Sequence, residues 1–246
     1  MRGENSGKKI LIVQHDESEG PGLFLPLAGQ RGIPAELCRL YEGGKIPASL
    51  ENVLAVISLG GPMNVYAQDE YPFLRDEEEM IKRALTEEVP ILGVCLGAQM
   101  LAKAAGARVT SGPRKEIGLG RIFFTSEGKA DPLFTGFESE IQVFQWHGDT
   151  FEIPHKGILL ASSEIYPHQA FRIKSKAYGL QFHLEATADM VADWVIRDRQ
   201  ELINESFNPE IIIKEMAAES EKMGYWMQKL WDNFLASVVG RTPKPL

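Results

Sequence analysis

Cys95 stands at the centre of a Gly-x-Cys-x-Gly motif, a setting that predicts a nucleophile. The apolar run at residues 89–94 predicts a buried strand, and residues 96–105 predict a helix that Gly106 ends in a left-handed conformation. A strand, a sharp turn and a helix with this motif at the corner are typical of a nucleophile elbow, here with sulfur in place of oxygen. The helix N-terminus is expected to lower the pKa of the thiol from its free value of about 8.5. A lone cysteine is more often a small buried hydrophobe, so the prediction depends on a catalytic partner.

His183 and Glu185 are the candidate partners. The alternating pattern of residues 178–185 predicts a strand, and strand side chains repeat every two residues, so His183 and Glu185 point the same way. A carboxylate beside an imidazole fixes the tautomer of the ring, and the other ring nitrogen can then take a proton from a nucleophile. Without the cysteine motif, a surface strand with two solvated polar residues would be the better interpretation.

Two glycines, Gly60 and Gly61, follow a buried strand predicted at residues 51–59. A backbone without side chains lets a substrate approach closely, and the Gly61 N–H can point at a developing negative oxygen. Pro62 then restricts the turn. An ordinary turn at the end of a strand is the alternative interpretation.

Three motifs, taken together, resemble the class I (triad) glutamine amidotransferases. They lie in order at residues 58–62, 93–99 and 181–185, and the similarity runs over about residues 8–188. The sequence departs from the pattern of many members at one position, where Leu184 replaces a proline. This change leaves the His-x-Glu spacing intact.

The resemblance assigns roles to further residues. It implies that the backbone N–H groups of Gly61 and Leu96 form the oxyanion hole and that Gln99, one turn into the helix, helps to bind glutamine. The loop at residues 144–149 resembles the loop beside the glutamine pocket in the GMP synthetase glutaminase unit. Residues 116–118 (Glu-Ile-Gly) resemble the E-x-G sequence at the start of the small antiparallel excursion in this family.

Gly60, Trp146 and His147 are therefore candidate substrate-binding residues, together with Gln99. A second interpretation of the 144–149 loop has comparable weight: an aromatic plug followed by a solvated Asp149.

Buried strands alternate with helical stretches from residue 9 to residue 105, which predicts a parallel α/β sheet. By resemblance the fold is flavodoxin-like, an open, mostly parallel sheet with helices on both faces and a small antiparallel excursion at 107–143. We expect a flexible N-terminus at residues 1–8, an amidotransferase-like domain at 9–188 and a C-terminal helical extension at 189–246.

Two details of the first half are open. His15 lies just beyond the carboxyl end of a strand, where open α/β sheets bind ligands, but a loop histidine is more often polar surface. Residues 72–88 predict an acidic helix whose charged side chains face solvent.

The composition narrows the function classes. The net charge of −8, without a Lys/Arg block, makes nucleic acid or an anionic membrane an unexpected partner. Two cysteines exclude a disulfide framework and suit a reducing cytoplasm. The sequence has no Cys/His cluster with metal-ligand spacing and no phosphate-binding loop, so we expect neither a metal nor an organic cofactor.

The expected reaction is hydrolysis of the glutamine side-chain amide through a γ-glutamyl thioester on Cys95. The acceptor of the ammonia would be a synthase on another polypeptide, because no second catalytic unit follows the motifs. A self-sufficient γ-glutamyl hydrolase or peptidase is the second interpretation. A non-catalytic binding or regulatory member of the fold is the third, and the complete set of Cys95, His183 and Glu185 argues against it.

Overall fold

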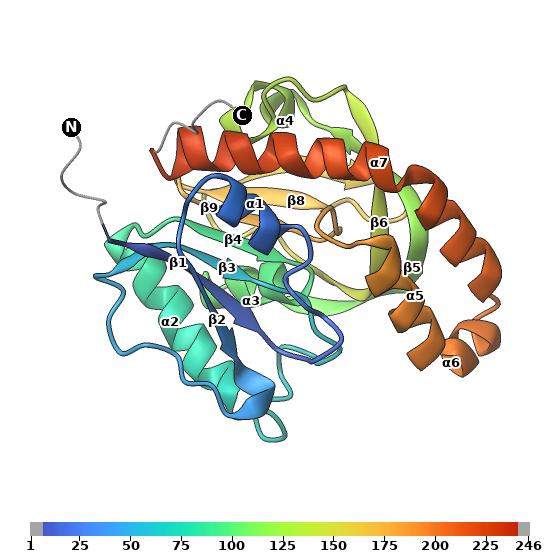
Figure 1. The fold of residues 1–246 in the computed structure, drawn as a ribbon, viewed down its shortest axis with the longest axis horizontal. Helices are drawn as coiled ribbons and strands as arrows, with labels where there is room; N and C mark the ends of the chain where they lie inside the picture. The colour runs from blue at the N-terminus through green and yellow to red at the C-terminus, as the bar shows by residue number, and fades with distance from the viewer. Residues whose placement is uncertain (1–6, 241–246) are drawn as a thin grey trace.

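The computed structural model describes residues 7–240, and within them the strands form one nine-stranded sheet (Figure 1). The strand order is β2-β1-β3-β4-β9-β8-β7-β5-β6. The first five strands in this order pair in parallel, and the remaining pairs are antiparallel. The bounds are β1 Lys9–Gln14, β2 Ala35–Arg39, β3 Val53–Ser58, β4 Ile91–Val94, β5 Val109–Phe124, β6 Glu140–Phe151, β7 Gly157–Ser163, β8 Ala170–Ile173 and β9 Ala177–Leu180.

Helices cover both faces of the parallel part. Successive residues of β1 point to opposite faces, and Ile10 and Leu11 accordingly belong to two different buried clusters. The cluster of Ile10 contains side chains of α1 (Phe24–Gln30) and α7 (Pro209–Asn233), and the cluster of Leu11 contains side chains of α2 (Phe73–Glu87) and α3 (Leu96–Ala104). The predicted α/β class with helices on both faces is confirmed.

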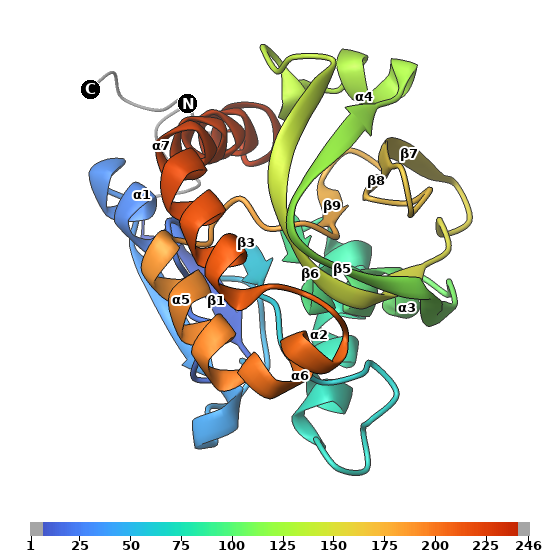
Figure 2. The same cartoon turned by 90° about the vertical axis from the view of Figure 1, so that its right-hand side faces the viewer.

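The antiparallel part extends the same sheet. β5 is 16 residues long and pairs with β6 along most of its length, so the two strands form the long curved ribbon seen in Figure 2. Residues 144–149, which the resemblance placed in a loop, lie instead within strand β6 of this ribbon. The short helix α4 (Ser126–Ala130) and the turn η2 (Pro132–Phe134) follow β5.

Between residues 188 and 233 the chain forms three α-helices. α5 (Ala188–Arg197) and α6 (Arg199–Asn204) meet at Asp198. Asn208 caps α7 by accepting a hydrogen bond from the Ile211 N–H at 3.1 Å. A π-helical turn, Phe234–Val238, ends this segment.

α7 packs on the sheet as part of the main core rather than standing apart from it. Its buried Trp231 lies 5.7 Å, between ring centroids, from Phe24 of α1. Asp232 accepts hydrogen bonds of 2.8 and 2.6 Å from the Arg31 guanidinium. The domain boundary at residue 188 stays a prediction, and the flexible N-terminus lies largely outside the described residues.

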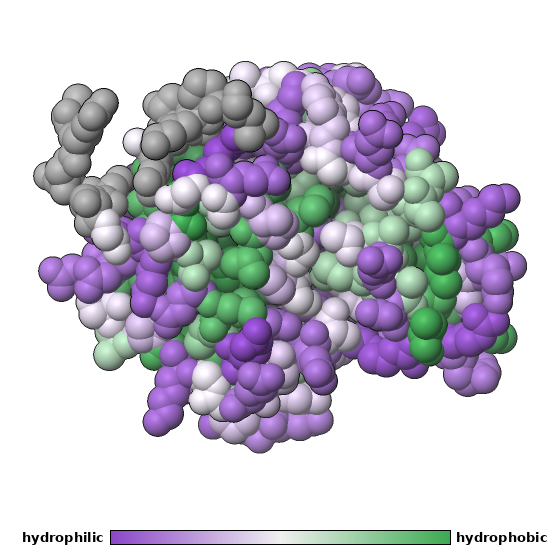
Figure 3. All heavy atoms as spheres, viewed as in Figure 1, coloured by the Kyte–Doolittle hydropathy of each residue, from purple (hydrophilic) through white to green (hydrophobic). Residues whose placement is uncertain are grey.

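Between residues 7 and 240 no helix has the length and apolar character needed to cross a membrane. Figure 3 shows hydrophilic and hydrophobic residues next to one another on one face of the molecule.

Candidate active site

Cys95 lies at a sharp corner between β4 and α3. Its backbone has φ 50° and ψ −107°, a conformation that residues with a side chain rarely adopt. A Cβ atom on Gly93 would lie 2.4 Å from the carbonyl oxygen of Gly97, and a Cβ on Gly97 would lie 2.1 Å from that of Ser58. The two glycines of the motif are therefore required by contacts across the turn, as a nucleophile elbow demands.

His183 and Glu185 meet beside this corner, although the predicted strand is too long. β9 ends at Leu180, because beyond it His183 exchanges backbone hydrogen bonds with Phe144 in an isolated bridge. The spacing nevertheless brings Nδ1 of His183 to 2.7 Å from Oε1 of Glu185. Both side chains are buried, and the second oxygen of Glu185 accepts a 3.1 Å hydrogen bond from the Leu184 N–H.

The charges of this group favour a proton on the imidazole. Burial opposes the imidazolium, but the charge of Glu185 and hydrogen bonds with Cys95 and Glu185 outweigh it and raise the pKa of His183 well above its usual value. Burial also raises the pKa of the Cys95 thiol, against a hydrogen bond from His183 that lowers it. The expected lowering of the thiol pKa is therefore wrong for the free site, and thiolate formation depends on transfer of the proton to His183.

Gly61 and Leu96 lie side by side next to Cys95. A Cβ on Gly61 would lie 2.7 Å from Cδ2 of Leu96, and Gly61 lines the cavity that Cys95 faces. Among the described residues, neither backbone N–H donates a hydrogen bond to the protein. Both donors are thus available to an oxygen bound at Cys95, the arrangement that an oxyanion hole needs.

Gln99 is held by the protein at the side of the cavity. Its amide nitrogen lies 3.3 Å from the carbonyl oxygen of Asp149 and 3.3 Å from Oε1 of Gln181. The amide of Gln181 in turn lies 3.7 Å from Sγ of Cys95. Gln99 is therefore linked to the nucleophile through Gln181.

Trp146 contributes both its backbone and its side chain. Its carbonyl oxygen lies 3.7 Å from Sγ of Cys95. Its indole ring packs between Phe144 and Trp194, at centroid distances of 6.0 and 5.9 Å. The ring of Trp146 thus packs in an aromatic cluster while its carbonyl lies near the nucleophile, and its role in binding substrate stays a prediction. Asp149, expected to be solvated in the aromatic-plug interpretation, is half-buried and accepts hydrogen bonds from Asn64 and Ser111.

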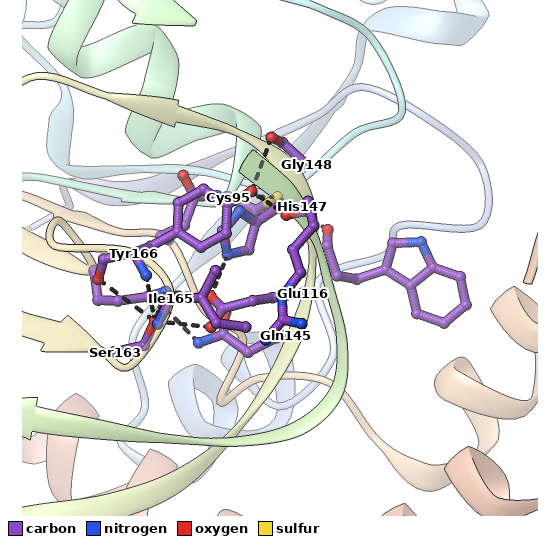
Figure 4. A network of polar contacts seen from close by, with 12 residues as sticks. Cys95, Glu116, Gln145, His147, Gly148, Ser163, Ile165 and Tyr166 are labelled. Carbon is purple, nitrogen blue, oxygen red and sulfur yellow. Dashed lines mark hydrogen bonds and ion pairs between the residues drawn. The ribbon is translucent and has the colours of Figure 1, made fainter. Parts of the chain in front are cut away.

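His147 is part of a polar network around Glu116 (Figure 4). Nε2 of His147 lies 3.1 Å from Oε2 of Glu116, and Nδ1 lies 3.0 Å from the carbonyl oxygen of Asp149. Glu116 also accepts hydrogen bonds from Ser163 at 2.8 Å and from Gln169 at 2.7 Å. This network fixes the imidazole at the edge of the cavity.

The cavity in front of Cys95 has a volume of about 430 Å³, and part of its wall comes from the C-terminal helices. Arg197 and Asp198 at the junction of α5 and α6, and Glu201 of α6, line it opposite Trp146. Lys115 of β5 forms an ion pair with Glu201 across the opening. Sequence reasoning treated these helices as a packed extension and missed their place at the site.

Glu19 is a second residue that sequence reasoning missed. Its Oε2 atom lies 2.1 Å from the position that a Cβ on Gly60 would take, and Cε1 of His183 lies 3.1 Å from the same position. Burial raises the pKa of this carboxyl to about 7, against the charges of His183 and Arg197. Gly60 therefore leaves room for a carboxyl group beside the catalytic imidazole. The only sequence signal was its position in the turn after a parallel strand.

His15 neither lies on the surface nor lines the cavity. It is fully buried behind Gly60 and contacts Glu77, a member of the acidic helix α2 that we expected to face solvent. His15 and Glu77 are 62 positions apart in the sequence, so no local pattern could pair them.

Comparison with known proteins agrees with this geometry. The family model "Glutamine amidotransferase class-I" matches residues 28–199. The glutamine amidotransferase-like protein YfeJ of Salmonella typhimurium is 32% identical over 197 residues, which cover 79% of this chain and 82% of that protein. A GMP synthase of Porphyromonas gingivalis is 36% identical over 150 residues, 60% of this chain but only 28% of the synthase.

Solved structures give the same result. A glutamine amidotransferase from Thermotoga maritima has a TM-score of 0.86 at 33% identity, covering 94% of this chain and 99% of that one. Another from Methylobacillus flagellatus has a TM-score of 0.86 at 27% identity, with 98% of each chain covered. The chain belongs to the class I glutamine amidotransferase family.

Proposed function

We propose that this protein hydrolyses the side-chain amide of L-glutamine through a γ-glutamyl thioester on Cys95. The observation that carries the proposal is the group formed by Cys95, His183 and Glu185 at the end of a cavity, with two unused backbone N–H groups beside the sulfur.

The chemistry begins with transfer of the Cys95 proton to His183, whose imidazolium Glu185 stabilises. The thiolate attacks the amide carbon, and the N–H groups of Gly61 and Leu96 hold the oxyanion. When the intermediate collapses, the C–N bond breaks and His183 gives its proton to the leaving ammonia. His183 then takes a proton from water, which attacks the thioester and releases glutamate and the thiol.

We propose further that the ammonia serves a synthase on another polypeptide. The matched GMP synthase is a longer protein, of which this chain spans 28%. The helices of residues 188–233 line the cavity and pack on the sheet, so they belong to the glutaminase unit itself.

A γ-glutamyl hydrolase or peptidase is the second candidate. The feature that favours it is the volume of the cavity, about 430 Å³, whose lining includes both Cys95 and Glu201 of α6. This space accommodates a leaving group larger than ammonia.

Ammonia release from glutamine, and product release from a γ-glutamyl dipeptide, test these proposals directly. We expect turnover by the wild type and loss to background for Cys95→Ala, because the nucleophile supplies the covalent route. The preferred donor separates the two candidates. If neither donor reacts and a glutamine-analogue chloroketone also fails to label Cys95, the catalytic proposal is wrong.

A further inference from the structure

Both ring nitrogens of the buried His15 face oxygen atoms. Nδ1 lies 3.0 Å from the carbonyl oxygen of Gly60, and Nε2 lies 2.7 Å from Oε2 of Glu77. The other oxygen of Glu77 accepts a 2.6 Å hydrogen bond from Oγ of Ser58. His15, Glu77 and Ser58 are all fully buried. Polar contacts therefore link Ser58 at the end of β3 and Glu77 of α2, through His15, to the backbone carbonyl of Gly60.

The protons of this group are fixed by its partners. A backbone carbonyl can only accept, so Nδ1 of His15 carries a proton. One more proton lies between Nε2 and Glu77, on the ring or on the carboxyl, and in either case the Nδ1–H still faces Gly60. Glu77 thereby selects the tautomer of His15, as a carboxylate does for a catalytic histidine.

The carbonyl that His15 contacts belongs to the peptide that carries the Gly61 N–H. This peptide bond is trans, so its carbonyl and its N–H point in opposite directions. The carbonyl faces His15 on one side, and Gly61 lines the cavity of Cys95 on the other. A hydrogen bond on the carbonyl side therefore sets the direction of the N–H on the cavity side.

The glycine pair makes such a contact necessary. Glycine has little preference between backbone conformations, so two glycines in succession do not hold their shared peptide in one orientation. The side of Gly61 is closely packed, because a Cβ there would lie 3.0 Å from Cβ of His15. His15 both packs against Gly61 and forms a hydrogen bond with the carbonyl of this peptide, so it can fix the orientation of the peptide.

We infer that His15 and Glu77 are positioning residues that hold the Gly60–Gly61 peptide with its N–H directed at the oxyanion. The inference rests on the proposed function, since it takes Gly61 as an oxyanion donor. The hydrogen bond to the carbonyl also polarises the peptide and strengthens its N–H as a donor. Neither residue contacts the substrate cavity.

Two substitutions of His15 separate the two contacts of its ring. In His15→Asn the amide nitrogen takes the place of Nδ1, so the hydrogen bond to Gly60 is kept while Glu77 still accepts from Ser58. In His15→Gln the amide lies near the position of Nε2, so the contact with Glu77 is kept and the one with Gly60 is lost. Both variants carry the same amide group, and they differ in whether the contact with Gly60 or the contact with Glu77 is kept.

We expect His15→Gln to lower kcat by about 10- to 100-fold with little change in KM, below the 10²- to 10³-fold effect of losing an oxyanion donor outright. His15→Asn should recover most of that loss. Alkylation of Cys95 by iodoacetamide forms no oxyanion, so its rate should stay within about twofold of wild type in both variants. Melting temperatures check that both variants are folded.

Equal kcat losses in the two variants, or alkylation rates that fall in parallel with kcat, would overturn the inference and indicate a purely structural role. Crystal structures give a readout that does not depend on turnover: the Gly60–Gly61 peptide should rotate in His15→Gln and keep its orientation in His15→Asn. An unrotated peptide in His15→Gln overturns the inference even if the wild type is active. A wild type that shows neither turnover nor labelling of Cys95 by the chloroketone overturns the proposed function, and the structures still decide the role of His15.

Discussion

Glu19 places a second carboxyl group at the triad, in addition to the one that orients His183. Glu185 contacts Nδ1 of the ring at 2.7 Å, whereas Glu19 lies near Cε1 and accepts no hydrogen bond from the described residues. Its pKa of about 7 means that its charge changes in the range where the enzyme would work. A negative charge at Glu19 raises the pKa of Cys95, so this residue opposes formation of the thiolate.

Glu19→Gln should therefore make Cys95 more reactive. Without the charge, the thiolate forms at lower pH, and we expect the pH profile of Cys95 alkylation to move down with a several-fold faster rate near pH 7. Glu17→Gln, in the same turn but exposed, is the matched control and should leave the profile in place. A profile that moves up, or does not move, contradicts this electrostatic role.

The gain in stability of Glu19→Gln over the wild type should increase as the pH rises. The folded protein holds the Glu19 proton more tightly than the unfolded chain, since its pKa is raised from 4.5 to about 7. Ionisation therefore costs stability as the pH rises from about 4.5 to about 7, and glutamine avoids that cost. Urea unfolding should show Glu19→Gln to be about 1–3 kcal/mol more stable than wild type at pH 8 and no different at pH 4. The same difference at both pH values would contradict this explanation.

At the scale of the element, the elbow is held by the contact of α3 with the end of β3. A methyl group on Gly97 would lie 2.1 Å from the carbonyl oxygen of Ser58, which is backbone and cannot move without shifting the strand that leads to Gly60. Gly97→Ala should lower both the free energy of unfolding, by about 2 kcal/mol or more, and turnover.

Gly29→Ala is the matched control for that substitution. Gly29 lies in α1, is exposed and has no atom within 4 Å of its added Cβ. It should be neutral or stabilising by up to about 1 kcal/mol, because alanine favours the helix. Equal effects of the two substitutions would show that the close contact at Gly97 does not control the elbow.

The elements that could be predicted from sequence are those whose chemistry is local. The elbow at Cys95 follows from two glycines within two residues of the nucleophile, and the His183–Glu185 contact follows from their spacing, even though the strand around them is shorter than predicted. Glu19 and the His15–Glu77 pair could not be predicted, because turn geometry and the packing of α2 bring them to the site from distant positions.

At the scale of the whole molecule, α7 joins the C-terminal segment to the core. Trp231 is fully buried between Phe24 and Phe234. Trp231→Ala should lower the free energy of unfolding by about 3–5 kcal/mol, as loss of a large buried side chain does. Tyr225, on the same helix but 54% exposed, is the control, and its substitution by alanine should cost less than about 1 kcal/mol. Equal losses in chemical denaturation would mean that α7 is only loosely attached.

The backbone conformation at Cys95 opposes thermal stability to catalytic activity. A side-chain-bearing residue at φ 50° and ψ −107° costs on the order of 1–3 kcal/mol, a strain that glycine does not carry. The residue that would make this corner most stable is thus one that cannot react. Cys95→Gly should melt at a higher temperature than the wild type, whereas Cys95→Ala, which keeps its Cβ, should not. Random substitutions selected only for heat resistance would then be expected to favour loss of the nucleophile, so thermal screening of this protein needs a parallel assay for catalysis.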